Sequence, residues 1–439
     1  MRYLSRRFFR LSLINIASTV TVPLVGLVDT AMLGHLPDIR FLAGVALASL
    51  LFDYIYWTLG FLRMSTTGMT AQAVGREDDI EIGRVLHRSL LIALVLGAAV
   101  LALQVPVREA GFALLSGEPA VEQAGRDYFN ARIWGAPAAL SGFVLLGWFL
   151  GRAESRYVLV MTVVANLGNV LLNYVFIVKL SLAAQGAGLA SMLSQYLMLA
   201  VGWTIYLRRR RPVPWCWAAV LERDRLAALF RLNRDILLRT LCLVSSFALF
   251  VNSSSVLGTL LLAANSILLR LQALASYLID GAAFASESLA GILRGQRDVR
   301  ALQRLFHLSL ATGLGFALLF LAGLFAAERP VLRLLTSHDD VIATSAAYAW
   351  WLAPVLLFGS LAYMYDGLFL GLTEGRRLRN AMLLSTFVVF LPACGAALWL
   401  DSNHALWAAM ALFMVARTAT LWAASRGALA SPIGEAGVL

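Results

Sequence analysis

A single carboxylate stands in the first long apolar segment of this chain. Asp29 follows a stretch without charged residues, and its neighbours Val28, Thr30 and Ala31 offer no basic partner at helical spacing. An ionised group at the centre of a bilayer costs at least ~2.5–3.5 kcal/mol, so such a residue needs a reason. A carboxyl group in apolar surroundings can take up and release a proton. Asp29 therefore predicts an ion-coupling site, and a structural hydrogen bond to a neighbouring helix is the alternative.

Amides and hydroxyls interrupt two later apolar segments of the first half. Asn169 and Asn173 are four residues apart, so on a helix they lie on one face, and Asn166 precedes them. Ser191 and Ser194 follow in the next apolar segment, close to glycines that allow helices to approach each other. Interhelical hydrogen bonding is the simpler explanation for any one of these asparagines.

The second half carries more charge inside its apolar segments. Asp235 is followed four residues later by Arg239, a spacing that lets the two neutralise each other. Asp280 and Glu287 are seven residues apart and share a helix face, whereas Asp366 stands near a helix end. These residues predict either a structural ion network or a second coupling site.

The elements that must position these residues are membrane-spanning helices. Of 439 residues, 60% are hydrophobic and only 14% are charged, which is too little polar surface for a soluble domain of this size. Apolar runs such as 308–327 and 380–400 are long enough to cross a bilayer. Twelve such helices can be placed, and arginine clusters fall in every second loop, which predicts that both termini are cytoplasmic. We therefore expect an all-α polytopic membrane protein.

An internal repeat divides the chain into halves. Residues 147–156 read GWFLGRAESR and residues 367–376 read GLFLGLTEGR, 220 positions later, with six of ten positions identical. Because each copy contains an even number of spans, both copies must enter the membrane from the same side. This predicts two parallel six-helix lobes related by a pseudo-twofold axis along the membrane normal. The expected parts are an N-lobe at 1–207, a basic cytoplasmic linker at 208–225 and a C-lobe at 226–439.

Several classes of function have no support in the sequence. The motifs of hydrolases, zinc proteases and P-loop ATPases are absent, so an enzyme or an ATP-driven pump is not expected. The three cysteines and five histidines are scattered and predict neither a disulfide framework nor a metal site. The net charge is +11, and the arginine clusters that cause it lie in loops between spans, which argues against nucleic acid as a partner.

The sequence resembles a known transporter family over nearly its whole length. Residues 23–31 (PLVGLVDTA) and 34–36 (GHL) resemble the first helix of the multidrug and toxic compound extrusion (MATE) family. Residues 62–68 (LRMSTTG) and 232–235 (LNRD), together with the pairs Asp280-Gly281 and Asp366-Gly367, are similar to its DNA-damage-inducible (DinF-like) branch.

The resemblance implies an antiporter that exchanges H⁺ or Na⁺ for organic molecules. It assigns the main coupling role to Asp29 and implies Tyr128, Asn169, Asn173 and Ser191 as its partners. Some relatives have aspartate where this chain has Asn173, so the site here has one carboxylate fewer. Because Na⁺ prefers more anionic oxygen, H⁺ is the favoured coupling ion.

The sequence thus predicts a secondary-active multidrug exporter that works by alternating access, with H⁺ coupling and organic, often cationic and amphipathic substrates. Arg63, Asn166 and Asn265 are the candidate substrate-binding residues. The expected setting is the bacterial inner membrane, with a monomeric chain and no cofactor beyond the coupling ion. Two alternatives stay open: Na⁺-coupled antiport, and a flippase for lipids or lipid-linked precursors.

Overall fold

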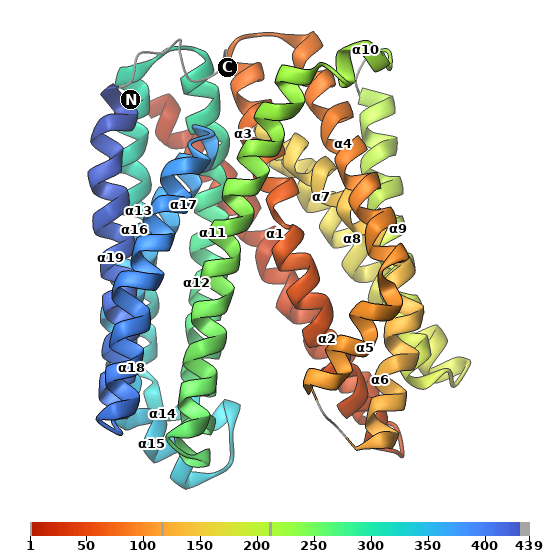
Figure 1. Ribbon diagram of the computed structural model, residues 1–439, viewed down its shortest axis with the longest axis vertical. Coiled ribbons are helices and arrows are strands. Elements are labelled where there is room, and N and C mark those ends of the chain that lie inside the picture. Colours follow the sequence, from red (N-terminus) through yellow and green to blue (C-terminus); the bar gives the residue numbers. More distant parts are fainter. Residues whose placement is uncertain (1, 116–117, 210–212, 431–439) are drawn as a thin grey trace. The chain divides into compact units, whose positions relative to one another are not determined.

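The structure is a computed structural model that describes residues 2–115, 118–209 and 213–430. Every regular element within these residues is a helix (Figure 1). Eleven helical stretches in this part of the chain are long and apolar enough to cross a membrane. The helix α1 (Arg2–Gly34) has 33 residues and corresponds to the remaining predicted span. The prediction of an all-α polytopic membrane protein is confirmed.

The chain forms two compact units. We call Ala17–Ala227 the N-terminal unit, and Met1–Ile16 with Ala228–Leu439 the C-terminal unit. The predicted lobes differ from these units in two respects. The N-terminal unit continues through the predicted linker 208–225 to Ala227, and residues 1–16 group with the second half of the chain. Gly281 explains this grouping, because a Cβ atom there would lie 2.6 Å from the backbone nitrogen of Ile16. The absence of a side chain lets the first part of α1 pack closely against α12 (Thr259–Gly295).

The N-terminal unit is a helical bundle in which several spans consist of two consecutive helices. Its elements after α1 are α2 (Arg40–Leu59), α3 (Phe61–Gly75), α4 (Asp79–Ala102), α5 (Gln104–Leu115), α6 (Pro119–Arg132), the 3₁₀ turn Ile133–Gly135, α7 (Ala136–Gly151), α8 (Ser155–Asn173), the π-helical segment Tyr174–Lys179, α9 (Ala183–Arg209) and α10 (Trp217–Val220).

The C-terminal unit has the same overall succession of helices. It contains α11 (Arg223–Val256) from residue 228 onward, α12, α13 (Val299–Ala326), α14 (Glu328–Leu335), α15 (Asp339–Ala349), α16 (Leu352–Gly371), α17 (Gly375–Leu384), the π-helical segment Ser385–Phe390, α18 (Leu391–Trp399) and α19 (Asn403–Ala430).

The sequence repeat at an offset of 220 residues reappears as repeated helix packing. A Cβ atom on Gly147 would lie 2.4 Å from the carbonyl oxygen of Arg63, and one on Gly367 would lie 2.5 Å from that of Ala283. Gly151 and Gly371 are in the same position relative to the carbonyl oxygens of residues 67 and 287. Small residues four apart let α7 contact α3 and let α16 contact α12 at backbone distance.

The turns that follow α3 and α12 are also repeated. Asp78 accepts a hydrogen bond from the backbone N–H of residue 81 and so caps α4, and Asp298 caps α13 in the same way. The residues just before these caps, Glu77 and Arg297, both have a positive φ, of 58° and 60°. The repeat inferred from sequence therefore extends to backbone conformation, and it places equivalent helices in the two units.

Candidate ion-coupling site

Asp29 is joined to α8 by a direct hydrogen bond. The side-chain amide of Asn173 donates through Nδ2 to Oδ1 of Asp29 at 2.5 Å, and the same nitrogen lies 3.0 Å from Oδ1 of Asn169. Both amides are buried, with 1% and 5% of their surface exposed, whereas Asp29 is half-buried. The three predicted residues therefore form one polar chain inside the N-terminal unit.

The geometry of α8 accounts for this chain. Residues four apart lie above one another on a helix, so Asn169 and Asn173 point to the same side. Asn173 is the last residue of α8, directly before the π-helical segment, and its Oδ1 is buried without a hydrogen-bond partner. An amide with one unused acceptor beside a carboxyl group can turn over and accept a proton-bearing oxygen instead of donating to an ionised one.

A cationic side chain from α6 acts on the same region. Arg132 donates to the hydroxyl of Tyr128 at 2.5 Å, and its guanidinium lies 4.5 Å from the centre of the Phe52 ring. Its charge interacts through space with the carboxylates of Asp29 and Asp53. The sequence showed no cation near Asp29 along its own helix, and the tertiary structure supplies one from α6.

Two other predicted residues of this unit occupy neighbouring positions. Asn166 donates from Nδ2 to Oγ1 of Thr21 at 2.9 Å, which is a second hydrogen bond between α8 and α1. Ser191 is half-buried on α9, and its carbonyl oxygen accepts a hydrogen bond from Ser194 at 2.7 Å. Tyr128 is buried, and its hydroxyl accepts hydrogen bonds from Arg132 and Ser49. The roles of Tyr128 and Ser191 in coupling stay predictions.

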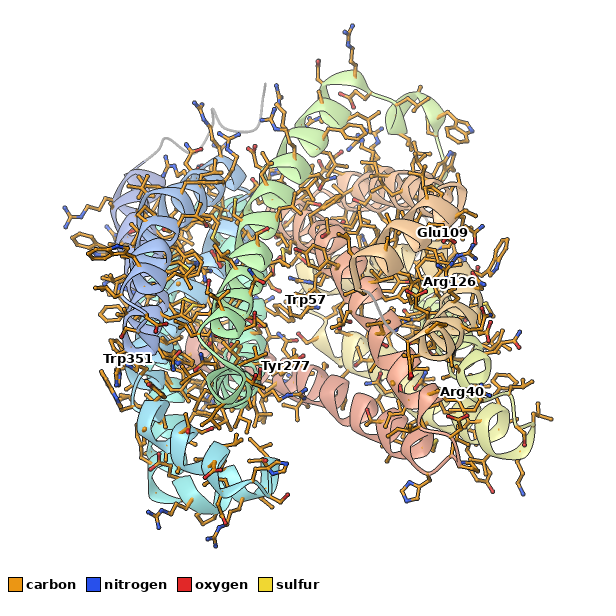
Figure 2. The ribbon with its side chains drawn as sticks, turned by 60° about the horizontal axis from the view of Figure 1, so that its bottom comes forward. Arg40, Trp57, Glu109, Arg126, Tyr277 and Trp351 are labelled. Carbon is orange, nitrogen blue, oxygen red and sulfur yellow. The ribbon has the colours of Figure 1, made fainter. Side chains whose placement is uncertain are left out.

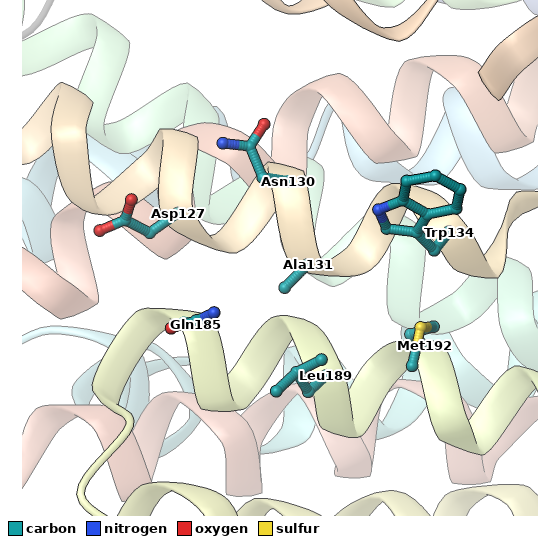
Figure 3. A pocket seen from close by; sticks show the side chains of 7 residues that line it. All are labelled: Asp127, Asn130, Ala131, Trp134, Gln185, Leu189 and Met192. Carbon is teal, nitrogen blue, oxygen red and sulfur yellow. The ribbon is translucent and has the colours of Figure 1, made fainter. Parts of the chain in front are cut away.

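A pocket of about 390 Å³ lies between α6 and α9 of the same unit. Figure 3 shows Asp127 and Gln185 toward one end of it, and Trp134 and Met192 toward the other. Arg108 of α5 donates to Oδ1 of Asn130 in the pocket lining at 2.6 Å. The next residue, Glu109, forms an ion pair with Arg126 of α6 at 2.7 Å, and both residues are labelled in Figure 2.

The charged residues of the C-terminal unit pair differently from the prediction. Arg239 does not neutralise Asp235; it forms an ion pair with Asp366 of α16. Asp366 also accepts a hydrogen bond from Arg417 of α19 at 2.7 Å, and Asp235 pairs with Arg379 of α17 at 2.7 Å. The i,i+4 prediction was wrong because partners on other helices lie closer. The sequence-based prediction did not include Arg417, although an arginine inside an apolar segment could have identified it as a buried charged residue.

Asp280 and Glu287 both lie on α12, as predicted. Asp280 is half-buried, and Glu287 has only 1% of its surface exposed. Arg63 is half-buried on α3, where its carbonyl oxygen accepts a hydrogen bond from Thr67 at 2.8 Å. The coupling role of Asp280 and Glu287 and the substrate-binding role of Arg63 stay predictions.

Asn265 has a different environment from the other candidates. It is fully buried; its Nδ2 donates to Asn403 at 2.7 Å and to Ser254 at 2.8 Å, and its Oδ1 accepts from Trp407 at 2.8 Å. All the hydrogen-bonding capacity of this amide is used to join α11, α12 and α19. These contacts give Asn265 a structural role in the arrangement described here, although a substrate-binding role was predicted.

Comparison with known proteins agrees with this architecture. The MatE family profile matches residues 16–175 and again residues 236–394, and these two segments begin 220 residues apart. The chain is 34% identical to DNA damage-inducible protein F of Escherichia coli (strain K12) over 424 residues, which covers 95% of this chain and 91% of that protein. It is 26% identical over 380 residues to multidrug and toxin extrusion protein 1 of Pongo abelii, covering 84% of this chain and 65% of that protein. It is also 30% identical over 214 residues, 46% of each chain, to probable multidrug resistance protein NorM of a Synechococcus strain.

Solved structures show the same fold at lower sequence identity. An outward-facing multidrug resistance MATE family transporter superposes with a TM-score of 0.87 at 20% identity, and 97% of each chain is covered. A MOP superfamily transporter from Pyrococcus furiosus superposes with the same TM-score at 19% identity, covering 97% of this chain and 96% of that one.

Proposed function

Because the chain belongs to the MatE family of membrane transporters, we propose that it exports small organic molecules in exchange for protons. The proposed setting is the bacterial inner membrane, with both termini in the cytoplasm, and the proposed mode is alternating access. Relatives named for multidrug resistance and multidrug extrusion support organic small molecules as substrates. Cationic, amphipathic molecules are the proposed class.

The hydrogen bond from Asn173 to Asp29 carries this proposal. An ionised Asp29 accepts from the amide of Asn173, as in this structure. A protonated Asp29 is a weaker acceptor and gains an O–H donor, and the unused Oδ1 of Asn173 can accept this donor once the amide turns over. Protonation thereby changes how α1 is held against α8, and this change is the proposed link between ion binding and the direction that the transporter faces.

The neutral amide supports H⁺ over Na⁺ as the coupling ion. A hard cation is bound best by several oxygen ligands with negative charge. Here one carboxylate stands beside an amide that presents its nitrogen, and the charge of Arg132 acts on the same carboxylate. A proton needs only the carboxyl oxygen itself, so this site suits H⁺.

The stoichiometry determines which part of the gradient can drive export. Exchange of one monovalent cation for one proton moves no net charge, so the membrane voltage, worth ~2.3 kcal/mol per charge at 100 mV, contributes nothing. Only the pH difference remains, at ~1.4 kcal/mol per pH unit. A second proton, bound for example at Asp280 or Glu287, would make the exchange sensitive to voltage.

Reconstituted protein in proteoliposomes tests the proposal. A pH gradient is imposed in Na⁺-free buffer, and transport of a monocationic dye is followed for the wild type, Asp29→Asn and Asp38→Asn. Asp38 is a matched control, because it is an exposed acid paired with Arg40 after α1. We expect Asp29→Asn to lower gradient-driven transport at least tenfold and Asp38→Asn to change it less than twofold.

Three results would count against the proposal. Gradient-driven transport by folded Asp29→Asn would remove the coupling role of Asp29. Transport that requires a Na⁺ gradient would identify Na⁺ as the coupling ion. Movement of a fluorescent lipid between leaflets without any pH gradient, and no dye transport, would indicate a flippase.

A further inference from the structure

The pocket between α6 and α9 lies at the depth of a membrane interface. The candidate span Pro119–Gly151 contains 33 residues, which corresponds to about 50 Å of helix, whereas the hydrocarbon core is about 30 Å thick. The polar first part of this span, α6, therefore extends into the headgroup region. Trp134 lies in the 3₁₀ turn Ile133–Gly135 directly after α6 and is 53% exposed.

The pocket has one polar end and one apolar end. Asp127 and Gln185 lie at one end, and Trp134 and Met192 at the other (Figure 3). Asp127 and Trp134 are seven residues apart, which corresponds to about 10 Å along the helix. Because α6 runs from the headgroup region toward the hydrocarbon core, the polar end faces water and the apolar end lies deeper. An amphiphile standing in its leaflet has the same orientation.

Asp127 supplies the carboxylate of the pocket lining. Arg108 and Arg126 both pair with Glu109, at 2.9 and 2.7 Å, and Arg126 also lies 3.9 Å from Glu122. Arg108 also donates to Oδ1 of Asn130 in the pocket lining at 2.6 Å, and none of these ion pairs involves Asp127. Asp127 accepts one hydrogen bond, from Gln123 at 2.9 Å, and a carboxylate has room for more donors.

We propose that this pocket binds an amphiphile with an ammonium headgroup, which contacts Asp127 while the alkyl chain runs past Leu189 toward Trp134 and Met192. The carboxylate attracts the cation, and the indole and thioether side chains offer an apolar, polarisable surface to the chain. The site is separate from the Asp29 site, because it opens between α6 and α9, whereas Tyr128 and Arg132 of the same helix contact Phe52 of α2.

Two sources could supply this headgroup chemistry. One is a bilayer lipid with an ammonium group, such as phosphatidylethanolamine, and the other is a soluble alkylammonium compound. The test therefore uses nanodiscs of pure phosphatidylglycerol, which contains no ammonium group, and then nanodiscs in which half of the lipid is phosphatidylethanolamine.

The probe is 12-bromododecylammonium, whose bromine quenches tryptophan fluorescence at contact. The full-length protein is titrated as wild type, Trp134→Phe, Asp127→Asn and Glu122→Gln. Because the chain has eleven tryptophans, quenching of the others adds a background signal. We expect a saturable component of the quenching that is lost in Trp134→Phe, an affinity of this component at least tenfold lower in Asp127→Asn, and an affinity within twofold of the wild type in Glu122→Gln. The Glu122 variant is the matched control, because it removes a carboxylate from the same helix outside the pocket.

The uncharged probe 12-bromododecanol tests the charge requirement in the wild-type protein, so the test does not depend on the folding of a variant. Equal quenching by the alcohol and the ammonium compound, or unchanged affinity in Asp127→Asn, would overturn the proposal. Because replacing half of the phosphatidylglycerol also halves the anionic surface charge, affinities are expressed per membrane-bound probe, measured in protein-free nanodiscs of each composition. A lower affinity on this scale with phosphatidylethanolamine would identify the membrane lipid as the occupant, and an unchanged affinity would identify the soluble amphiphile.

Discussion

The amide of Asn173 donates to the carboxylate of Asp29 across 2.5 Å, and this bond joins the end of α8 to α1. The family resemblance leads us to expect aspartate in place of Asn173 in some relatives, which would give the site a second carboxylate. A neutral donor in that place stabilises the ionised form of Asp29 without adding negative charge. The identity of residue 173 therefore bears directly on which ion the site can use.

Asn173→Asp should change the ion dependence of transport. Two carboxylates within hydrogen-bond distance do not both stay ionised unless a cation lies between them. We expect Na⁺ to stimulate dye transport by the variant and to have no effect on the wild type. Transport rates in Na⁺ and in choline buffers provide the measurement. Asn166→Asp, on the same helix but bonded to Thr21, is the control, and equal Na⁺ indifference in all three proteins would contradict this prediction.

Asp366→Asn should destabilise the C-terminal unit. The variant leaves Arg239 and Arg417 buried without their shared carboxylate, and loss of one partner from a buried ion pair costs roughly 3–5 kcal/mol. Thermal unfolding of purified protein measures the effect. Arg379→Met, which leaves Asp235 its contact with Arg234, should cost less. Wild-type stability together with lost pH-driven transport would instead assign Asp366 to coupling.

Gly371→Ala should destabilise the protein, and Gly315→Ala should not. A Cβ atom on Gly371 would lie 2.2 Å from the backbone oxygen of Glu287, so α16 must move away from α12, at a cost of roughly 1–3 kcal/mol. Gly315 on α13 has nothing within 4 Å of a new Cβ atom, so alanine should stabilise that helix by about 0.5–1 kcal/mol. Relative to the wild type, the unfolding midpoint should fall in Gly371→Ala and rise in Gly315→Ala, and equal midpoints in the two variants would contradict the repeated glycine contact.

Arg88→Met should release the segment around α10. The Arg88 side chain is fully buried, donates to the carbonyl oxygen of Ala219 at 3.0 Å, and pairs with Glu81 at 2.8 Å and Glu222 at 3.4 Å. It holds this segment against α4 within the N-terminal unit. We expect limited proteolysis between residues 213 and 222 to become at least several-fold faster. Arg84→Met is the control on the same helix, and equal cleavage rates in both variants would refute the anchoring role.

Glu109 should contribute to stability only above the acid range. Hydrogen bonds from Arg126 and Arg108 hold the pKa of Glu109 below its ordinary value of 4.5. A group with a lowered folded-state pKa stabilises the protein above its unfolded pKa, and this contribution is lost as the pH falls through the folded value. The unfolding midpoints of wild type and Glu109→Gln should differ at pH 6 and converge in strongly acidic buffer. A constant difference across that range would contradict the assignment.

Much of the fold was predictable because it depends on local chemistry. Apolar runs must cross the bilayer as helices, since backbone groups have no other hydrogen-bond partners there. The repeated motif beginning at Gly147 and Gly367 showed the duplication, and both copies pack through the same glycines. Asp29 and Asn173 were both selected by the presence of polar groups in apolar segments, and the structure places them in contact.

Pairings between distant segments were less predictable. Asp235 and Arg239 have ideal spacing for a pair, yet each binds a residue more than 100 positions away in the chain. Asn265 was selected by its polarity, and the structure shows that this polarity joins three helices. A sequence pattern indicates that a buried polar group needs a hydrogen-bond or charge partner, but it does not identify the helix that supplies this partner.

The sequence alone determined that this chain crosses a membrane as a duplicated set of helices and that Asp29 needs a polar partner, because hydrophobicity and helical spacing are properties of neighbouring residues. Only the tertiary structure decided that Asn173 is this partner, that Arg132 acts on the same carboxylate and that Asp366 lies between two arginines. Hydrogen bonds and charges act over a few ångströms, and the packing of helices sets which distant residues come that close.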